Sequence, residues 1–377
     1  MKQYRIGMIG YGAIGRAHLL GFHGIPYYYG LPADTVRVVG VATSRAETAQ
    51  AAAREIGCEF WTDDYHELIA RDDIDVVAIA TPNNVRVDVV LEAAAAGKHI
   101  FCEKPLARTV TEARRMVEAV EAAGVTAQVN FNFRFYPAVQ RARRLVEEGF
   151  LGQVSTYRGT FYRSSYIDPQ KPLSWKLQHE QAGGGALYDL GSHTLDMATF
   201  LLGEVEAVFA VTETFIRERP VRKGAAETGV VDVDDVALLE LRMASGALGS
   251  IQTTRLATGV TNELSLEIFG ERGALRFDSH DPSWLWAYSR DEAGSPVEGF
   301  HRVQTGGGFA GQLAPDATMP PGIVETFAAS QYAFLRAIEE GREPTPSFRE
   351  ALHVQAIMQA AQQSAAEGRW VRVDEVG

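Results

Sequence analysis

Three titratable side chains with regular spacing follow a run of three glycines near the middle of the chain. Asp189, His193 and Asp196 are separated by four and three residues, so a helix would place them along one face. A histidine between two acids suits general acid–base chemistry, because its ordinary pKa lies near neutrality. The glycines at 183–185 remove side-chain bulk, as a loop against a ligand requires. A capped helix with a solvated acidic edge would show the same pattern, so both interpretations remain open on these residues alone.

A glycine-rich turn near the start of the chain is a second candidate site. It lies between an apolar run at 5–9 and a helical stretch that begins at residue 16. Its G-x-G-x-x-G spacing is typical of dinucleotide binding, because the glycines allow a tight turn, close approach of a pyrophosphate, and packing of helix on strand. The helix N-terminus adds amide donors and a positive dipole. We therefore predict cofactor contacts from Gly10, Tyr11, Gly12, Ala13, Ile14 and Gly15.

The end of the second predicted strand, at 36–42, bears on which dinucleotide is used. An acid there would bind the ribose hydroxyls of NAD, whereas an arginine would suit the 2′-phosphate of NADP. No acid stands at positions 42–45, where Ser44 and Arg45 are found. We therefore predict NAD or NADP as the cofactor, with these two residues favouring NADP. The alternative is that Arg45 is an ordinary exposed residue in the first turn of a helix.

Alternating strands and helices predict a doubly wound parallel sheet over residues 1–130. Ligands of such sheets bind beyond the carboxyl ends of the strands. Strands ending at 80 and 102 lead into the loops 81–83 and 103–105, which gives five further cofactor candidates: Thr81, Pro82, Asn83, Glu103 and Lys104. Lys104 is also a candidate for chemistry, because it directly follows a buried strand. An ordinary solvated lysine is the alternative.

After residue 132 the pattern changes to the period-two alternation of an antiparallel sheet. Strands are predicted at 154–161, 205–215, 236–242, 248–254, 264–269, 274–277 and 284–288. The length also suggests two domains. We therefore expect an α/β chain with a Rossmann domain at 1–130 and a second, α+β domain at 131–377. Its closing helices, at 322–340 and 348–367, could pack back on the first domain. The stretch 294–321, rich in glycine and proline, is expected to be a long loop over the cleft or an interface.

Composition and charge limit the partners. The formal net charge is -12, so the chain shows no electrostatic footprint for nucleic acid or an anionic membrane. Cys58 and Cys102 lack the spacing of metal ligands, and reduced thiols without a metal are expected. The first residues lead directly into a strand, and no apolar run is long enough to span a bilayer. We therefore expect a soluble, cytoplasmic protein.

Taken together, the motifs resemble the glucose–fructose oxidoreductase/inositol dehydrogenase/MocA (Gfo/Idh/MocA) family. The resemblance covers nearly the whole chain and rests on the glycine turn, Thr81-Pro82-Asn83, Glu103-Lys104-Pro105, Asn132 with Arg134, and the stretch 183–196. It implies a second domain built on an open, mainly antiparallel sheet, through which a homodimer or homotetramer would form. The segment 172–175 and the long first crossover at 24–34 look most like bacterial sugar dehydrogenases of pyranose-type or anhydrosugar substrates. The 24–34 insertion is expected to be a lid or a subunit contact.

The resemblance also implies a catalytic set of Lys104, Asp189 and His193. His193 would accept the hydroxyl proton of a secondary alcohol while the carbinol hydride passes to nicotinamide. Lys104, after which a cis peptide bond to Pro105 is implied, would stabilise the alkoxide. Asp189 would orient the imidazole or bind a neighbouring hydroxyl, the glycines would make room for the ligand, and Asp196 would be structural.

Further contacts with cofactor and substrate are implied or suggested. Trp175 and Lys176 resemble the family's tryptophan–arginine pair at the cofactor and substrate, with lysine in place of arginine, and the resemblance makes both cofactor candidates. Arg86 stands where many relatives have histidine, which leaves its contacts undefined. Aromatic and hydrogen-bonding residues suit polyols, and the candidates for sugar contacts are Asn132, Tyr157, Arg163, Tyr166, Trp175 and His179. Asn132 is also a cofactor candidate.

The predicted function is NAD(P)-dependent hydride transfer to or from a secondary alcohol or ketone of a sugar, anhydrosugar or inositol. Three other classes of protein are alternatives. A glycosidase of the same fold would retain its nicotinamide and give no net reduced cofactor. A non-catalytic cofactor-binding sensor would be expected to lack the catalytic set. A metal-dependent enzyme would have only Asp189 and His193 as suggested ligands.

Overall fold

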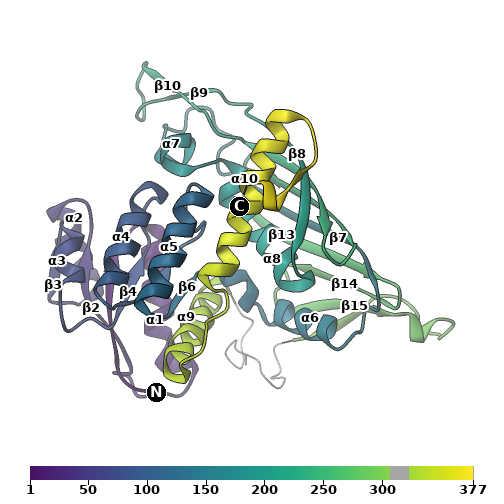
Figure 1. Ribbon diagram of the computed structural model, residues 1–377, viewed down its shortest axis with the longest axis horizontal. Coiled ribbons are helices and arrows are strands. Elements are labelled where there is room, and N and C mark those ends of the chain that lie inside the picture. The colour runs from purple at the N-terminus through teal and green to yellow at the C-terminus, as the bar shows by residue number, and fades with distance from the viewer. Residues whose placement is uncertain (306–321, 377) are drawn as a thin grey trace.

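The computed structural model describes residues 1–305 and 322–376. The fold has two parts, which we call the first half (residues 1–131) and the second half (the described residues after 131). The first half is built on a parallel six-stranded sheet (Figure 1). The strand order is β3-β2-β1-β4-β5-β6, with every described pair parallel. This is the doubly wound order of dinucleotide-binding domains, as predicted. Of these six strands β3 was not predicted, because its three residues contain only two apolar side chains and stand at the exposed edge of the sheet. The strands are Tyr4–Ile9 (β1), Val36–Ala42 (β2), Phe60–Thr62 (β3), Val76–Ile79 (β4), His99–Cys102 (β5) and Ala127–Val129 (β6).

Helices cover both faces of this sheet because its strands are apolar on both sides. In β4, Val76 and Ala78 pack with one face's helices, and Val77 and Ile79 pack with the other's. The first face carries α1 (Ala13–Tyr28), α2 (Ala46–Ile56) and, from the far end of the chain, α9 (Ile323–Glu340). The second face carries α3 (Tyr65–Ile69), α4 (Asn83–Ala95) and α5 (Val110–Ala123).

The 24–34 insertion extends α1 and fastens α9 to it. Tyr28 Oη donates to Glu325 at 2.9 Å, and the Tyr29 ring stacks on Tyr332 with centroids 3.7 Å apart. This aromatic packing against α9 argues against the expected lid, whereas the alternative, a subunit contact, stays a prediction.

A second, nine-stranded sheet occupies the other half of the molecule (Figure 1). Its order is β16-β15-β14-β13-β7-β12-β11-β8-β17, and all neighbours are antiparallel except β7 and β12. The mainly antiparallel prediction is confirmed. The strands are Val154–Arg163 (β7), Val205–Glu213 (β8), Val236–Met243 (β11), Leu248–Thr254 (β12), Asn262–Gly270 (β13), Gly273–Asp278 (β14), Trp284–Ser289 (β15), His301–Gln304 (β16) and Val371–Arg372 (β17).

Part of the expected loop at 294–321 is strand β16, and residues 306–321 lie outside the described residues. A separate hairpin pairs Glu218–Pro220 (β9) with Thr228–Val230 (β10).

Three helices pack on one face of the large sheet: α6 (Pro137–Glu147), α8 (Ser192–Leu202) and α10 (Phe348–Glu367). Among the helices in the described part of the chain, none has the length and apolar character that a membrane crossing requires.

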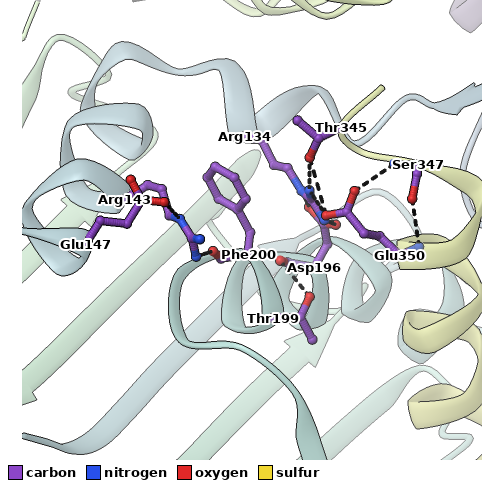
Figure 2. Close-up of polar contacts among 9 residues, drawn as sticks. All are labelled: Arg134, Arg143, Glu147, Asp196, Thr199, Phe200, Thr345, Ser347 and Glu350. Atoms are coloured by element: carbon purple, nitrogen blue, oxygen red, sulfur yellow. Dashed lines mark hydrogen bonds and ion pairs between the residues drawn. The ribbon is translucent and has the colours of Figure 1, made fainter. Parts of the chain in front are cut away.

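A buried arginine joins the two halves (Figure 2). Arg134 lies in a short 3-10 turn, Asn132–Phe135 (η1), directly after the first sheet. Its Nε donates to Asp196 Oδ2 of α8 at 2.9 Å, and its Nη1 donates to Glu350 Oε1 in the first turn of α10 at 2.6 Å. Asp196 is fully buried, which fits the structural role predicted for it. Helix α8 is thus tied to the end of the first sheet and to the start of α10.

Replacing Arg134 tests how much its ion pairs with Asp196 and Glu350 stabilise the fold. Arg134→Met is expected to lower the free energy of unfolding by about 3–5 kcal/mol, because it leaves the Asp196 carboxylate buried without its cation. The measurement is denaturant unfolding of the cofactor-free protein. Arg336→Met is the matched control, since Arg336 and Glu340 form an exposed ion pair one helical turn apart on α9, and such surface pairs add little stability. Equal losses in the two variants would contradict a special role for Arg134.

Candidate active site

The loops beyond the carboxyl ends of the first sheet meet the second half of the chain at a cavity of about 260 Å³. It brings together half of the predicted site residues. From the first half and its junction come Ile14, Thr81, Asn83, Glu103, Lys104 and Asn132; from the second half come Arg163, Trp175, Lys176, Asp189 and His193.

The glycine turn has the geometry that a dinucleotide needs. Gly10 has a φ of +90°, and an added Cβ there would lie 2.6 Å from the carbonyl oxygen of Ala80. A Cβ on Gly15 would approach the Gly10 carbonyl oxygen equally closely. In contrast, a Cβ on Gly12, the residue before α1, would meet no described atom within 4 Å. The protein itself requires Gly10 and Gly15, whereas Gly12 keeps open the space before the helix N-terminus, which fits a bound pyrophosphate.

Arg86 holds two of the cofactor-side loops together. It is 2% exposed, its Nη2 donates to the Thr81 carbonyl at 2.8 Å, and its Nη1 donates to the carbonyl of Pro105. The contacts that the sequence left undefined are therefore backbone carbonyls. The Lys104–Pro105 peptide bond is cis, as the resemblance implied. Asn83 extends the framework, because its Nδ2 donates to the carbonyl of Ala182 in the second half at 2.8 Å.

Glu103 is a buried carboxylate that fixes the backbone of Lys104. Its Oε1 contacts His18 Nε2 at 2.8 Å and accepts from Asn130 Nδ2 at 2.7 Å, and its Oε2 accepts from the Lys104 amide at 3.1 Å. Burial by itself would raise the pKa of Glu103, but the hydrogen bonds from His18 and Asn130 and the charge of His18 outweigh it and hold the pKa at about 2.

Asp189 is the centre of a cluster of cations. Lys104 Nζ donates to the Asp189 carbonyl at 2.6 Å and to Oδ1 at 3.2 Å. Lys176 Nζ lies 3.2 Å from Oδ1, and Arg255 Nη2 lies 3.4 Å from Oδ2. Burial alone would raise the pKa of Asp189, but Lys176, Lys104 and Arg255 hold it well below its usual range. Burial lowers the pKa of Lys104, and Asp189 opposes that shift.

This cluster corrects the expected contact between Asp189 and His193. Both side chains line the cavity, yet the described bonds of the carboxylate go to cations and not to the imidazole. The physical reason is that a carboxylate gains more from three cations than from a neutral ring.

His193 is buried among aromatic rings and is 5% exposed. Its ring centroid lies 4.4 Å from that of Phe133 and 5.8 Å from that of Phe161. Burial lowers the pKa of His193 well below its ordinary value, and the charge of Lys104 adds to this effect. The imidazole is therefore neutral at pH 7 and able to accept a proton. A π-helical turn, Leu187–Gly191 (η3), precedes α8 in place of the regular helix predicted, a feature frequent at functional sites.

The three glycines before this turn allow the chain to pack against itself. A Cβ on Gly183 would lie 2.8 Å from the Arg108 backbone, one on Gly184 would overlap the Tyr188 ring, and one on Gly185 would overlap the Asp234 carbonyl. Gly184 also lines the cavity, so the expectation that the glycines make room for a ligand stays a prediction there. The Asp234 carboxylate completes this packing by accepting from the amides of Gly185 and Leu187 at 2.8 and 2.7 Å.

Three predicted sugar contacts lie outside the cavity lining. Tyr157 is 2% exposed and donates to the carbonyl of Thr194 at 3.1 Å, because this part of β7 lies beneath α8. Tyr166 packs under cations, with Arg255 5.0 Å from its ring centroid. His179 is exposed at the start of the short helix His179–Ala182 (α7). Ser44 and Arg45 are exposed at the end of β2, also outside this cavity.

Sequence analysis missed Arg255, which is 1% exposed and lines the cavity directly after β12. Its Nη1 donates to the Lys176 carbonyl at 3.2 Å. A charged residue at the end of a predicted strand was a usable signal, and it had identified Lys104. Asn262, at the start of β13 and paired in register with Arg163, was also missed, because strand register is not visible in the sequence.

Comparison with known proteins places the chain in a family. Residues 4–131 match the model of an oxidoreductase family with an NAD-binding Rossmann fold, and residues 143–373 match the C-terminal alpha/beta domain of the same family. The chain therefore belongs to the Gfo/Idh/MocA oxidoreductases. It is an oxidoreductase with an NAD-binding Rossmann fold.

Named relatives cover the whole length of the chain. Levoglucosan dehydrogenase of Pseudarthrobacter phenanthrenivorans is 39% identical, and the match covers 100% of both chains. Inositol 2-dehydrogenase of Rhizobium meliloti is 30% identical over 98% of this chain and 99% of its own. A solved structure of levoglucosan dehydrogenase in complex with NADH and levoglucosan has a TM-score of 0.93 and 38% identity, covering 99% of this chain and 100% of that chain.

Two alanine substitutions separate packing glycines from ligand-facing ones. Gly12→Ala should leave stability unchanged within about 0.5 kcal/mol and weaken NADH binding about tenfold or more, because its methyl group enters the space kept for the pyrophosphate. Gly185→Ala should cost about 1–3 kcal/mol of stability by overlap with Asp234. Denaturant unfolding and NADH fluorescence titration give the two readouts. Unchanged NADH affinity in Gly12→Ala would contradict this placement of the pyrophosphate.

Proposed function

We propose that this cavity oxidises a ring secondary alcohol of a pyranose-type sugar or anhydrosugar to the ketone. The observation that carries the proposal is the pairing, in one cavity, of a cationic Lys104 with a buried neutral His193 beyond the carboxyl edge of the dinucleotide-binding sheet. The likeness to levoglucosan dehydrogenase over the full length supports an anhydrosugar or pyranose-type substrate.

In this proposal one side chain accepts the hydroxyl proton and another stabilises the negative charge that develops on the oxygen. The bound nicotinamide supplies the hydride acceptor. His193 accepts the hydroxyl proton as general base. Lys104 donates a hydrogen bond to the same oxygen and stabilises its negative charge, and Asp189 holds the Lys104 ammonium in place at 3.2 Å. Thr81, Asn83, Asn132 and Trp175 form the cavity wall that positions cofactor and sugar.

The same framework favours net dehydrogenation over the alternatives. A catalytic set assembled in a cavity argues against a non-catalytic sensor, and the named dehydrogenase relatives favour net oxidation over a glycosidase cycle.

We also propose that subunits associate through the outer face of the large sheet. That face exposes apolar side chains that no described helix covers: Val211, Leu238, Leu248 and Trp286.

A sugar panel with a lysine variant tests the proposed function. Levoglucosan, hexoses and inositols are incubated with NAD and with NADP, and net reduced nicotinamide is measured. Lys104→Met should lower kcat about 100-fold or more, because one oxyanion donor is removed, while NADH still binds. Lys223→Met, at an exposed position, is the control. Unchanged turnover in Lys104→Met would rule out its assigned role, and no net reduction with any sugar would refute the function.

The pH profile tests His193. Because burial and Lys104 lower its pKa, the neutral base is fully present at pH 7 and is lost only when the pH falls well below 6.5. The acid limb of kcat/KM should therefore lie well below pH 6.5, and His193→Asn should abolish it together with most of the rate. A variant profile that keeps the parent's acid limb would show that another group is the base.

For the cofactor, we propose that Ser44 and Arg45 accept a 2′-phosphate, so that NADP is used as well as NAD. Both residues are exposed at the end of β2, where no acid stands to repel the phosphate. Arg45→Ala should raise the KM for NADP severalfold more than the KM for NAD. Arg54→Ala, on the same helix α2, is the control. Equal changes in both KM values would mean that Arg45 is an ordinary surface residue.

A further inference from the structure

Positive charge exceeds negative charge in the lining of the active-site cavity. Five cationic side chains line it, against two carboxylates, although the whole chain carries a formal net charge of -12. Arg86 is bound by backbone carbonyls, and Glu103 is bound by His18 and Asn130. Asp189 is therefore the one carboxylate in this lining that is left to balance the charge of four remaining cations: Lys104, Arg163, Lys176 and Arg255.

Two of these cations, both lining the cavity, have a buried Nε without a hydrogen-bond partner among the described residues, as Arg86 does too. Arg163, at the end of β7, forms no ion pair with any described residue, and its buried Nε has no hydrogen-bond partner there. Arg255 is 1% exposed, and its Nε is likewise without a partner among the described residues. A buried guanidinium with an unused donor is costly unless a ligand supplies the acceptor.

The positive region extends beyond the cavity wall. Lys171 lies over the Tyr166 ring at 3.9 Å, beside Arg219 and Arg255, which approach the same ring at 5.7 and 5.0 Å. Burial lowers the pKa of Lys171, and Arg219, Arg163, Lys176 and Arg255 lower it further. The neighbouring acid Asp234 offsets part of this charge, since the charge of Arg255 acts on its carboxylate, but Asp234 does not line the cavity and its oxygens accept from the Gly185 and Leu187 amides.

The dinucleotide does not account for these cations. Its pyrophosphate is assigned to the glycine turn after β1, whereas Arg163 and Arg255 stand at the ends of β7 and β12; of the cavity's cations from the second half, only Lys176 is also a candidate for a cofactor contact. An oxidised nicotinamide ring is itself a cation and adds to the excess. A neutral sugar supplies hydrogen-bond acceptors but no charge. A carboxylate supplies both, and it matches the planar fork of an arginine.

We propose that the sugar this enzyme oxidises carries a carboxylate, which Arg163 and Arg255 bind while the reacting carbinol faces Lys104 and His193. The proposal rests on the proposed function and narrows its substrate class to sugar acids. In the step itself the carbinol C–H bond breaks, its hydride reduces the oxidised dinucleotide, the O–H proton passes to His193, and a keto acid leaves. The carboxylate takes no part in bond making and supplies only binding and orientation.

Matched substrate pairs test this inference. Each pair contains a hexuronate and the hexose from which it differs only at C6, such as galacturonate with galactose and glucuronate with glucose. The ratio of kcat/KM, acid over neutral, should be about tenfold or more for at least one pair. Arg163→Gln should bring that ratio close to one, and Arg163→Lys should keep part of it. Arg158→Gln is the control, because Arg158 lies on the same strand and is exposed.

Three outcomes separate this inference from the proposed function. An acid preference that disappears in Arg163→Gln and survives in Arg158→Gln supports it. Neutral sugars or levoglucosan oxidised as well as or better than every uronate, or a preference unchanged in Arg163→Gln, would overturn the inference and leave the function intact. No net reduction of either dinucleotide with any sugar would overturn the function as well. Stabilisation of the NADH complex by a hexuronate but not its hexose, in thermal unfolding, gives a readout that does not need turnover.

Discussion

The ion cluster around Asp189 is the interaction on which the active site depends. One buried carboxylate binds Lys104 from the first half of the chain and Lys176 and Arg255 from the second. Because the site is largely shielded from water, removal of any partner would leave charge without compensation. The cluster therefore fixes Lys104 and also joins the two sides of the cavity. Among the described residues no acid is hydrogen-bonded to His193, whose imidazole is neutral and able to accept a proton.

Other buried polar contacts make this arrangement rigid. Arg86 joins the Thr81 and Pro105 carbonyls, Asn83 reaches Ala182, and Arg134 ties α8 to η1 and α10 (Figure 2). Apart from the bond between Arg86 and Thr81, these contacts join segments that are distant in sequence, so side chain to backbone hydrogen bonds and ion pairs hold the cavity wall. Preorganisation of this kind is what hydride transfer requires, since donor, base and acceptor must be aligned before reaction.

Much of this architecture could be predicted from local pattern. The glycine turn, the alternation of strands and helices, and Lys104 after β5 each follow from rules that act over a few residues. What could not be predicted depends on packing between distant segments. Close packing against Asp234, Tyr188 and Arg108 requires the glycines at 183–185. Tyr157 lies beneath α8, and Arg255 reaches Asp189 from the end of β12. Sequence identifies residues able to do chemistry, whereas the register of the large sheet decides which of them meet.

The central claim is hydride transfer from a sugar carbinol within this cavity, and isotope transfer tests it most directly. A substrate deuterated at its ring carbinol carbons is oxidised by the enzyme in a single turnover, and the reduced dinucleotide is analysed by mass spectrometry and by NMR at nicotinamide C4. The account predicts one deuterium per reduced nicotinamide, on one face of C4, and slower reduction than with the undeuterated sugar. Reduced dinucleotide without deuterium, or loss of substrate deuterium to water, would contradict it.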